Sequence, residues 1–271
     1  MDIGIAVLAG LVVGLVVGAL GAGGGILAVP TLVYALGQDP HDAAASSLVI
    51  VAMTSLVSLT PRWRSVKWKQ GSVFGALTVV GSFIGAQVSL ALDPDALMVA
   101  FSVVLAAVAA VMARRVIRPR TPVPHSSLPI LIVAATLTGL FTGFFGVGGG
   151  FLVVPMLVVA MGFTMKDAAT TSLFVMVIVS IIGLVARIGS DVTIDFPVVL
   201  AFGAASMAAS LFGERLTRRA SERTLTAVFC ALLTAVSIVM MVGSLPKLLD
   251  TTSEEAGQLA GIERLVRTGT D

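Results

Sequence analysis

Residues 21–30 read Gly21-Ala22-Gly23-Gly24-Gly25-Ile26-Leu27-Ala28-Val29-Pro30, and a near copy, Gly146-Val147-Gly148-Gly149-Gly150-Phe151-Leu152-Val153-Val154-Pro155, follows 125 residues further on. We term these stretches the first and the second break, because inside a helix glycine costs about 1 kcal/mol and proline about 3 kcal/mol relative to alanine. Each break lies in a long apolar run. A helix that breaks at membrane depth needs protein or a water-filled cavity to satisfy its backbone, so the breaks predict a site.

The composition of the chain is that of a protein embedded in a membrane. Its 271 residues are 57% hydrophobic and 12% charged, whereas a soluble domain carries roughly 25% charged residues. Apolar runs of about 18 residues or more recur, and such runs are typical of transmembrane helices. The sequence therefore predicts an all-α, polytopic membrane protein. Its basic residues lie between the apolar runs, as topology signals do, and form no nucleic-acid pattern.

The chain divides into two homologous repeats. About 16 of the 28 residues from Gly21 to Leu48 are identical to those at a shift of 125 positions, where chance would give roughly two. We expect a first transmembrane repeat over residues 1–113, a basic, proline-rich linker over 114–127, a second transmembrane repeat over 128–243 and a polar tail over 244–271.

The number of crossings depends on how each break is counted. With one crossing around a break, each repeat has four spans and the repeats are parallel; with two crossings, each has five and the second repeat is inverted. Cytoplasmic loops carry the excess of Lys and Arg. With five spans, the basic residues of 62–69, 114–120 and 215–223 share one side with Lys166, and only Arg187 and the tail oppose them. We therefore favour inverted repeats, with 8 to 10 transmembrane segments and glycine-broken helices.

The apolar pieces that follow the breaks are short. The piece from Ile26 to Leu36 spans about 16 Å at 1.5 Å per residue, against a hydrocarbon core of about 30 Å. The segments that flank a break are therefore expected as half-helices or as re-entrant hairpins, and the sequence leaves both open.

The two breaks are the candidate substrate site. Discontinuous helices of secondary transporters point their N-termini at anionic groups near the bilayer midplane. A helix N-terminus carries roughly half a positive charge and unpaired N–H donors, so it can hold an oxyanion without a lysine. In the alternative interpretation, the glycines serve helix packing and the nearby hydroxyls bond to their own helices. The predicted substrate-binding residues are Gly23, Gly24, Gly25, Pro30, Ser46, Ser47, Gly148, Gly149, Gly150, Pro155, Thr171 and Ser172.

Other polar residues of the apolar runs are expected to have structural roles. Asp42 and Asp167 begin matched helices and are predicted to be N-caps. Arg187 ends an apolar run, so we expect its side chain to extend to the interface, with substrate binding as the alternative. Gln87 is expected to bond to a neighbouring helix, and Cys230 to be a small buried residue. A single cysteine excludes a metal site built from cysteines, and we expect neither a metal nor a cofactor.

The breaks and the helices after them resemble the TauE/SafE family of sulfite-exporter-like permeases. The likeness lies in the glycine-rich break followed by proline, in the Ala-rich helices with Ser or Thr at 42–48 and 167–173, and in the basic-aromatic stretch from Arg62 to Trp68. It runs from about Ile3 to Val242. The resemblance implies a substrate among sulfite, sulfoacetate and related sulfur-containing or organic anions.

The sequence thus predicts a multi-pass permease of the bacterial inner membrane that carries a small anion by alternating access. Its partners would be the anion, the lipid bilayer and a coupling ion if transport is coupled; nucleic acid is excluded, and the oligomeric state is open. A passive anion channel is the first alternative. A membrane-embedded enzyme would need reactive groups at membrane depth, where Cys230 is the sole candidate, so we expect no enzyme. A purely structural subunit would not need duplicated breaks.

Overall fold

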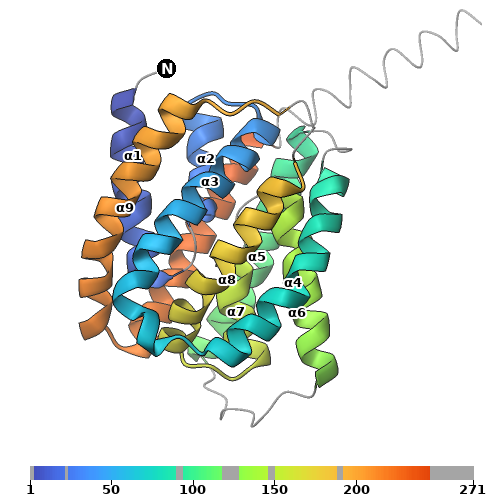
Figure 1. The fold of residues 1–271 in the computed structure, drawn as a ribbon, viewed down its shortest axis with the longest axis vertical. Helices are drawn as coiled ribbons and strands as arrows, with labels where there is room; N and C mark the ends of the chain where they lie inside the picture. Colours follow the sequence, from blue (N-terminus) through green and yellow to red (C-terminus); the bar gives the residue numbers. More distant parts are fainter. Residues whose placement is uncertain are drawn as a thin grey trace, which may run out of the picture.

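The computed structural model describes residues 3–21, 24–89, 94–117, 128–145, 150–187 and 192–244, and within these ranges every secondary-structure element is a helix. A π-helix, Thr31–Ala35, continues α2, and a 3₁₀-helix, Thr60–Ser65, follows α3. The other helices are α1 (Ile3–Leu20), α2 (Gly25–Pro30), α3 (Pro40–Leu59), α4 (Trp68–Ser89), α5 (Pro94–Ile117), α6 (Leu128–Phe145), α7 (Gly150–Ala160), α8 (Met165–Val185), α9 (Phe196–Arg219) and a last helix, Glu222–Ser244 (Figure 1).

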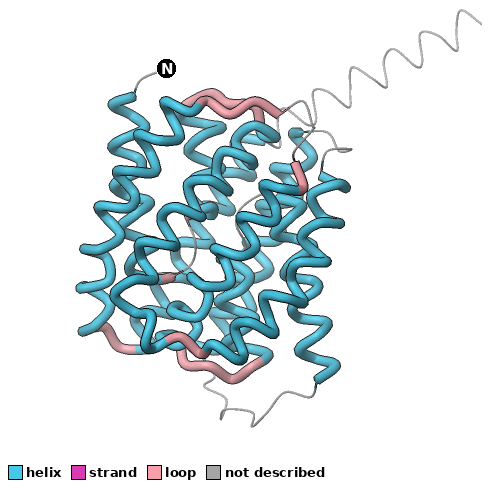
Figure 2. The backbone as a smooth tube through the Cα atoms, viewed as in Figure 1, coloured by secondary structure: helices cyan, strands magenta, loops and turns pink. Residues whose placement is uncertain are grey.

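The helices form one bundle whose described loops lie mainly at its two ends (Figure 2). Within the described chain, seven helices are long and apolar enough to cross a membrane, and three shorter apolar helices cover Gly25–Ala35, Pro129–Phe145 and Gly150–Ala160. The all-helical, multi-pass architecture predicted from the sequence is therefore confirmed. The count of 8 to 10 spans and the boundaries of the repeats stay predictions.

Glycines bring α1 and α9 into backbone contact. Gly10 of α1 lies against Phe202 of α9, and Gly18 lies against Ser210. The residue numbers rise together, so the two helices run in the same direction. A Cβ added at Gly18 would lie 1.9 Å from the carbonyl oxygen of Ser210, where no side chain fits. Helices α4 and α6 form a second parallel seam of this kind, as expected where small residues let membrane helices approach closely.

Helices α3 and α8 cross the middle of the bundle in opposite directions. Leu48 near the start of α3 lies against Gly183 near the end of α8, whereas Ser55 near the end of α3 lies 3.7 Å from the sulfur of Met176. Helices α1, α3 and α9 thus run one way, and α4, α6 and α8 run the other way (Figure 1). Each of the helices α1, α3 and α4 is antiparallel to the helix that lies about 125 residues further along the chain, namely α6, α8 and α9.

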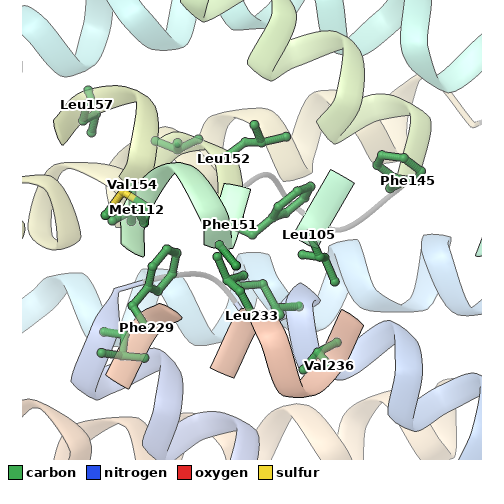
Figure 3. Close-up of a cluster of buried hydrophobic side chains, with 14 of the residues drawn as sticks. Leu105, Met112, Phe145, Phe151, Leu152, Val154, Leu157, Phe229, Leu233 and Val236 are labelled. Atoms are coloured by element: carbon green, nitrogen blue, oxygen red, sulfur yellow. The ribbon is translucent and has the colours of Figure 1, made fainter. Parts of the chain in front are cut away.

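An apolar cluster fills the space around α7. The ring of Phe101 in α5 lies 4.9 Å from that of Phe145 in α6 and 5.3 Å from that of Phe151 in α7, measured between centroids. Figure 3 shows how side chains of α5, α6, α7 and the last helix gather in this cluster, Leu105 and Phe229 among them. Many close van der Waals contacts stabilise such a core even where lipid replaces water outside. The helix after the second break is therefore packed in protein.

The two predicted N-caps are wrong. Asp39 caps α3, because its carboxylate accepts a backbone N–H of the first turn at 2.8 Å. Thr164 caps α8, and its hydroxyl accepts the N–H of Asp167 at 3.0 Å. Asp42 and Asp167 lie in the first turn of their helices, because both helices begin earlier than the apolar runs do. Their negative charge still suits a helix N-terminus.

Candidate functional site

The first break begins at the end of α1. Gly21 follows Leu20 with a φ of +61°, in the left-handed region that glycine adopts without strain. A Cβ added at Gly21 would lie 2.1 Å from the carbonyl oxygen of Ala169 in α8. Both the backbone conformation and the close approach therefore require glycine here. As a result, the first break lies directly against the first turns of α8.

The carbonyl groups at the end of α1 are satisfied by protein. The last carbonyls of a helix have no partner within it, and in lipid each unsatisfied group would cost several kcal/mol. Side-chain donors from the 3₁₀-helix, α9 and α8 meet them: Arg62 donates to Gly18, Thr217 to Ala19, and Ser172 to Gly21 at 2.6 Å. These contacts explain how the helix can end inside the bundle.

Beyond the first break, α2 starts against α1. Gly24 is the N-cap of α2 and is buried, and a Cβ added there would lie 3.2 Å from a methyl group of Val13. Gly25 begins α2, and the buried Pro30 ends it. Because proline lacks an N–H, the regular hydrogen-bond ladder is interrupted, and the chain continues as the π-helix Thr31–Ala35. Within this stretch of irregular helix Leu32 is buried, and the stretch packs against α3.

The second break is described only from Gly150 onward. Gly150 begins α7, Pro155 lies inside this helix, and both residues are buried. The predicted site residues outside the described part of the chain are Gly23, Gly148 and Gly149. Their assignment to the site stays a prediction.

Arg187 contacts the end of α6, the helix before the second break. Its side chain is 5% exposed, and it donates to the carbonyl oxygens of Gly183 at 3.4 Å and of Gly143 at 3.1 Å. The expectation that Arg187 extends to the interface is therefore wrong. Burial lowers the pKa of Arg187 to about 10, so it keeps its charge at neutral pH. Arg187 and Gly143 match Arg62 and Gly18 at the shift of 125, so an arginine caps the helix before each break.

The four predicted hydroxyl residues are fully buried near the starts of α3 and α8. Ser47 and Ser172 donate to carbonyl oxygens of their own helices, as the packing alternative expects. The hydroxyl of Thr171 accepts the backbone N–H of Lys67 at 3.3 Å. Within the described residues, Ser46 has no hydrogen-bond partner for its hydroxyl, which is unusual for a buried polar group. Of the four, the described contacts bring only Ser172 to a break.

Of two further residues, Gln87 has the predicted packing role, whereas Cys230 is less buried than expected. The side-chain amide of Gln87 in α4 donates to the carbonyl oxygen of Ala186 at 3.0 Å, as predicted for a bond between helices. Cys230 is a free, partly buried thiol in the last helix. Neither residue lies at a break.

A polar pocket of about 330 Å³ lies beside the first break. Its lining includes Arg62 and Ser65 from the 3₁₀-helix, Thr170 from α8, and Glu214 and Thr217 from α9. The Nε atom of Arg62 lies 3.9 Å from Oε1 of Glu214, and both side chains are largely buried. Since Arg62 and Thr217 also bind the end of α1, the pocket reaches the helix end that precedes the break.

Sequence reasoning missed the burial of Arg62 beside the first break. It stands in the stretch Arg62 to Lys69, whose basic and tryptophan residues suggest a membrane interface, and Trp63 and Trp68 are indeed exposed. One signal was present: Arg62 and Arg187 are separated by the same 125 positions as the breaks. The spacing identifies the two arginines as a matched pair, and the contacts in the structure show that both are buried.

Comparisons with known proteins identify the family of the chain. The family model for the sulfite exporter TauE/SafE matches residues 6–240. A probable membrane transporter protein of Xylella fastidiosa (strain 9a5c) is 30% identical over 245 residues, which cover 86% of this chain and 92% of the relative. The probable membrane transporter protein YunE of Bacillus subtilis is 28% identical over 255 residues, covering 84% and 93%.

More distant relatives carry similar names. A probable membrane transporter protein of Methanocaldococcus jannaschii is 24% identical over 251 residues, which cover 87% of this chain and 94% of the relative. No solved structure matches the chain. The names of the family and of these relatives describe transporters rather than enzymes. The chain therefore belongs to the sulfite exporter TauE/SafE family and is a multi-pass integral membrane transporter with relatives in bacteria.

Proposed function

We propose that the protein is a secondary transporter that carries a small oxyanion by alternating access. The substrate class is sulfite, sulfoacetate or a related sulfur-containing or organic anion, in keeping with the name of the family. The observation that carries the proposal is the satisfied end of α1 at the first break, where Arg62, Ser172 and Thr217 supply donors inside the bundle. A helix interrupted in this way is the usual device of transporter substrate sites.

Two inverted repeats would underlie this mechanism. Their support comes from α3 and α8, which stand at matched sequence positions and run antiparallel. Further support comes from the arginine contacts, since Arg62 with Gly18 and Arg187 with Gly143 repeat at one shift. Two halves of opposite orientation allow an inward-open and an outward-open state of similar structure around one site.

The proposed site lies between the two breaks. Backbone N–H groups at the starts of α2 and α7 would bind the anion, since helix N-termini favour negative charge. The hydroxyl of Ser46 supports this placement, because it is buried and has no partner among the described residues. The residues assigned to the site are Gly23, Gly24, Gly25, Pro30, Ser46, Ser47, Gly148, Gly149, Gly150, Pro155, Thr171 and Ser172.

Counterflow in proteoliposomes tests the proposed function. Vesicles that contain the purified full chain are loaded with unlabelled sulfite or sulfoacetate, and uptake of the labelled anion is followed against empty liposomes. A carrier gives saturable uptake that unlabelled anion on the opposite side accelerates. Uptake that rises linearly with concentration and shows no counterflow would identify a passive channel and would contradict alternating access.

A further inference from the structure

We propose that Arg62 is an anion-binding residue of the pocket beside the first break, and that the carboxylate of Glu214 occupies it while no anion is bound. This inference rests on the proposed function for its substrate class. It adds a second site to the breaks themselves, one built from charged side chains instead of backbone N–H groups.

The geometry of the pocket places Arg62 between two acceptors. Its guanidinium donates to the carbonyl oxygen of Gly18, at the negative end of the α1 dipole, and its Nε atom lies 3.9 Å from Glu214. The side chains of Arg62 and Glu214 are 9% and 10% exposed. The guanidinium of Arg62 thus lies at Gly18, which is three residues before Gly21, where the first break begins. An anion bound to Arg62 would lie next to the break.

Stability alone does not account for this ion pair. Removing two charges from water costs several kcal/mol per ion, and well-packed apolar residues in place of a buried pair are often as stable or more stable. A buried carboxylate beside an arginine at the edge of a pocket can instead serve as an internal substitute for a ligand. An incoming anion then takes the place of the Glu214 carboxylate beside Arg62, so the guanidinium always faces a negative charge.

The shape of the guanidinium selects the class of anion. Arginine presents its N–H donors as a planar fork, which binds two oxygens of one acid group side by side. Sulfite, sulfonates and carboxylates have that pair of oxygens, and chloride does not. A volume of about 330 Å³ is sufficient for such small anions. Hydroxyls of Ser65 and Thr170 line the same pocket and can donate to further oxygens.

The pocket faces the more basic end of the bundle. Lys166 and Asp167 both belong to its lining, and the carboxylate of Asp167 is paired with the exposed Lys67 at 4.0 Å. By the distribution of Lys and Arg, this end is the cytoplasmic one. The anion would therefore reach Arg62 from the cytoplasm, attracted by Lys166 in the lining, before it reaches the break.

Binding measurements on variants of Glu214 and Arg62 test the inference. The purified full chain in detergent is titrated with sulfite, sulfoacetate and chloride, and anion binding is read from the shift in the thermal unfolding midpoint. We expect Glu214→Gln to lower the apparent Kd for sulfite about tenfold, which corresponds to about 1.4 kcal/mol. We expect Arg62→Gln to raise it at least about tenfold. Chloride should bind weakly to all variants.

Glu222→Gln is the matched control. It removes the same charge at the same end of the bundle, but Glu222 lies outside the pocket and accepts the backbone N–H of Met165. Its Kd for sulfite should stay within about twofold of that of the unchanged chain. If Glu222→Gln tightens binding as much as Glu214→Gln does, net charge explains the effect and the inference is overturned. An unchanged Kd in Glu214→Gln overturns it as well, and this variant keeps the shape of the glutamate should Arg62→Gln fail to fold.

Parallel flux measurements separate this inference from the proposed function. If the variants change sulfite binding as expected but the unchanged chain shows no counterflow, the anion site stands and the transporter proposal fails. If counterflow is present but neither variant changes the Kd, transport stands and Arg62 is no anion site. Absence of any thermal shift with sulfite or sulfoacetate also contradicts the inference.

Discussion

The ends of α1 and α6 are built alike but have different surroundings. Arg62 donates to Gly18 near the end of α1, and Arg187 donates to Gly143 near the end of α6. Arg62 also forms an ion pair with Glu214 at the polar pocket. The other described donation of Arg187 goes to the carbonyl oxygen of Gly183 in α8, the helix that ends just before Arg187.

This difference separates two roles that one residue type can have. Both arginines satisfy carbonyl groups where a helix ends before a break, which is a structural requirement of any interrupted helix in a membrane. The carboxylate of Glu214 and the polar pocket accompany Arg62. The carbonyl contact that both arginines make is therefore best tested by measuring stability. The ion pair of Arg62 with Glu214 is best tested by measuring anion binding.

The largest effect is expected from placing a side chain in either glycine seam, that is, in the contact of α1 with α9 or of α4 with α6. A Cβ added at Gly18 would lie 1.9 Å from the carbonyl oxygen of Ser210, and one added at Gly143 would lie 1.9 Å from that of Ser82. Overpacking usually costs about 1–3 kcal/mol, but here the obstacle is backbone that cannot move aside, so neither Gly18→Val nor Gly143→Val should yield folded protein. Gly4→Val is the control, since nothing lies within 4 Å of a Cβ there. Size-exclusion chromatography of each variant measures the outcome, and a monodisperse Gly143→Val would show that the two seams differ.

An intermediate effect is expected from removing the arginines. Arg62→Ala removes a donor from the carbonyl group of Gly18 and the positive charge that faces Glu214, and breaking a buried ion pair in this way costs about 3–5 kcal/mol. Arg187→Ala leaves carbonyl groups unsatisfied, for which we expect about 1–3 kcal/mol. Thermal unfolding midpoints in detergent give the order. The double variant Arg62→Ala with Glu214→Ala should recover part of the loss; no recovery would mean that Glu214 does not contribute.

The smallest effects are expected at the hydroxyls. Ser172→Ala removes the bond to Gly21 and should cost about 1 kcal/mol of stability. Ser46→Ala removes a hydroxyl with no described partner, so stability should be unchanged while the KM for the anion rises about tenfold, the equivalent of one hydrogen bond. Ser58→Ala is the control in the same helix, because Ser58 bonds to its own helix at 2.7 Å. An unchanged KM in Ser46→Ala would remove Ser46 from the proposed site.

The positions of the helices follow closely from the sequence. The apolar run Ile3 to Leu20 coincides with α1, and the break after it lies where glycine and proline stop the pattern. This success has a simple cause: in a membrane, apolar length and helix-breaking residues decide where helices begin and end, and both are local properties. The apolar stretch that begins at Phe196 likewise coincides with the start of α9.

The partners of the helices could not be predicted from these local properties. Glycines spaced at Gly10, Gly14 and Gly18 predict a closely packed face but not that α9 covers it. The burial of Arg62 likewise depends on Glu214, which lies far along the chain. A run of basic residues and tryptophans suggests an exposed loop, and only the tertiary contacts show that one of its arginines turns inward.

The two glycine seams also determine which parts of the protein can move as rigid bodies. The seam of α1 with α9 and the seam of α4 with α6 each join a helix from residues 1–113 to a helix from residues 128–243. Backbones in direct contact cannot slide past each other without separating first. The moving units of a transport cycle would thus be these two mixed pairs, not the two halves of the sequence.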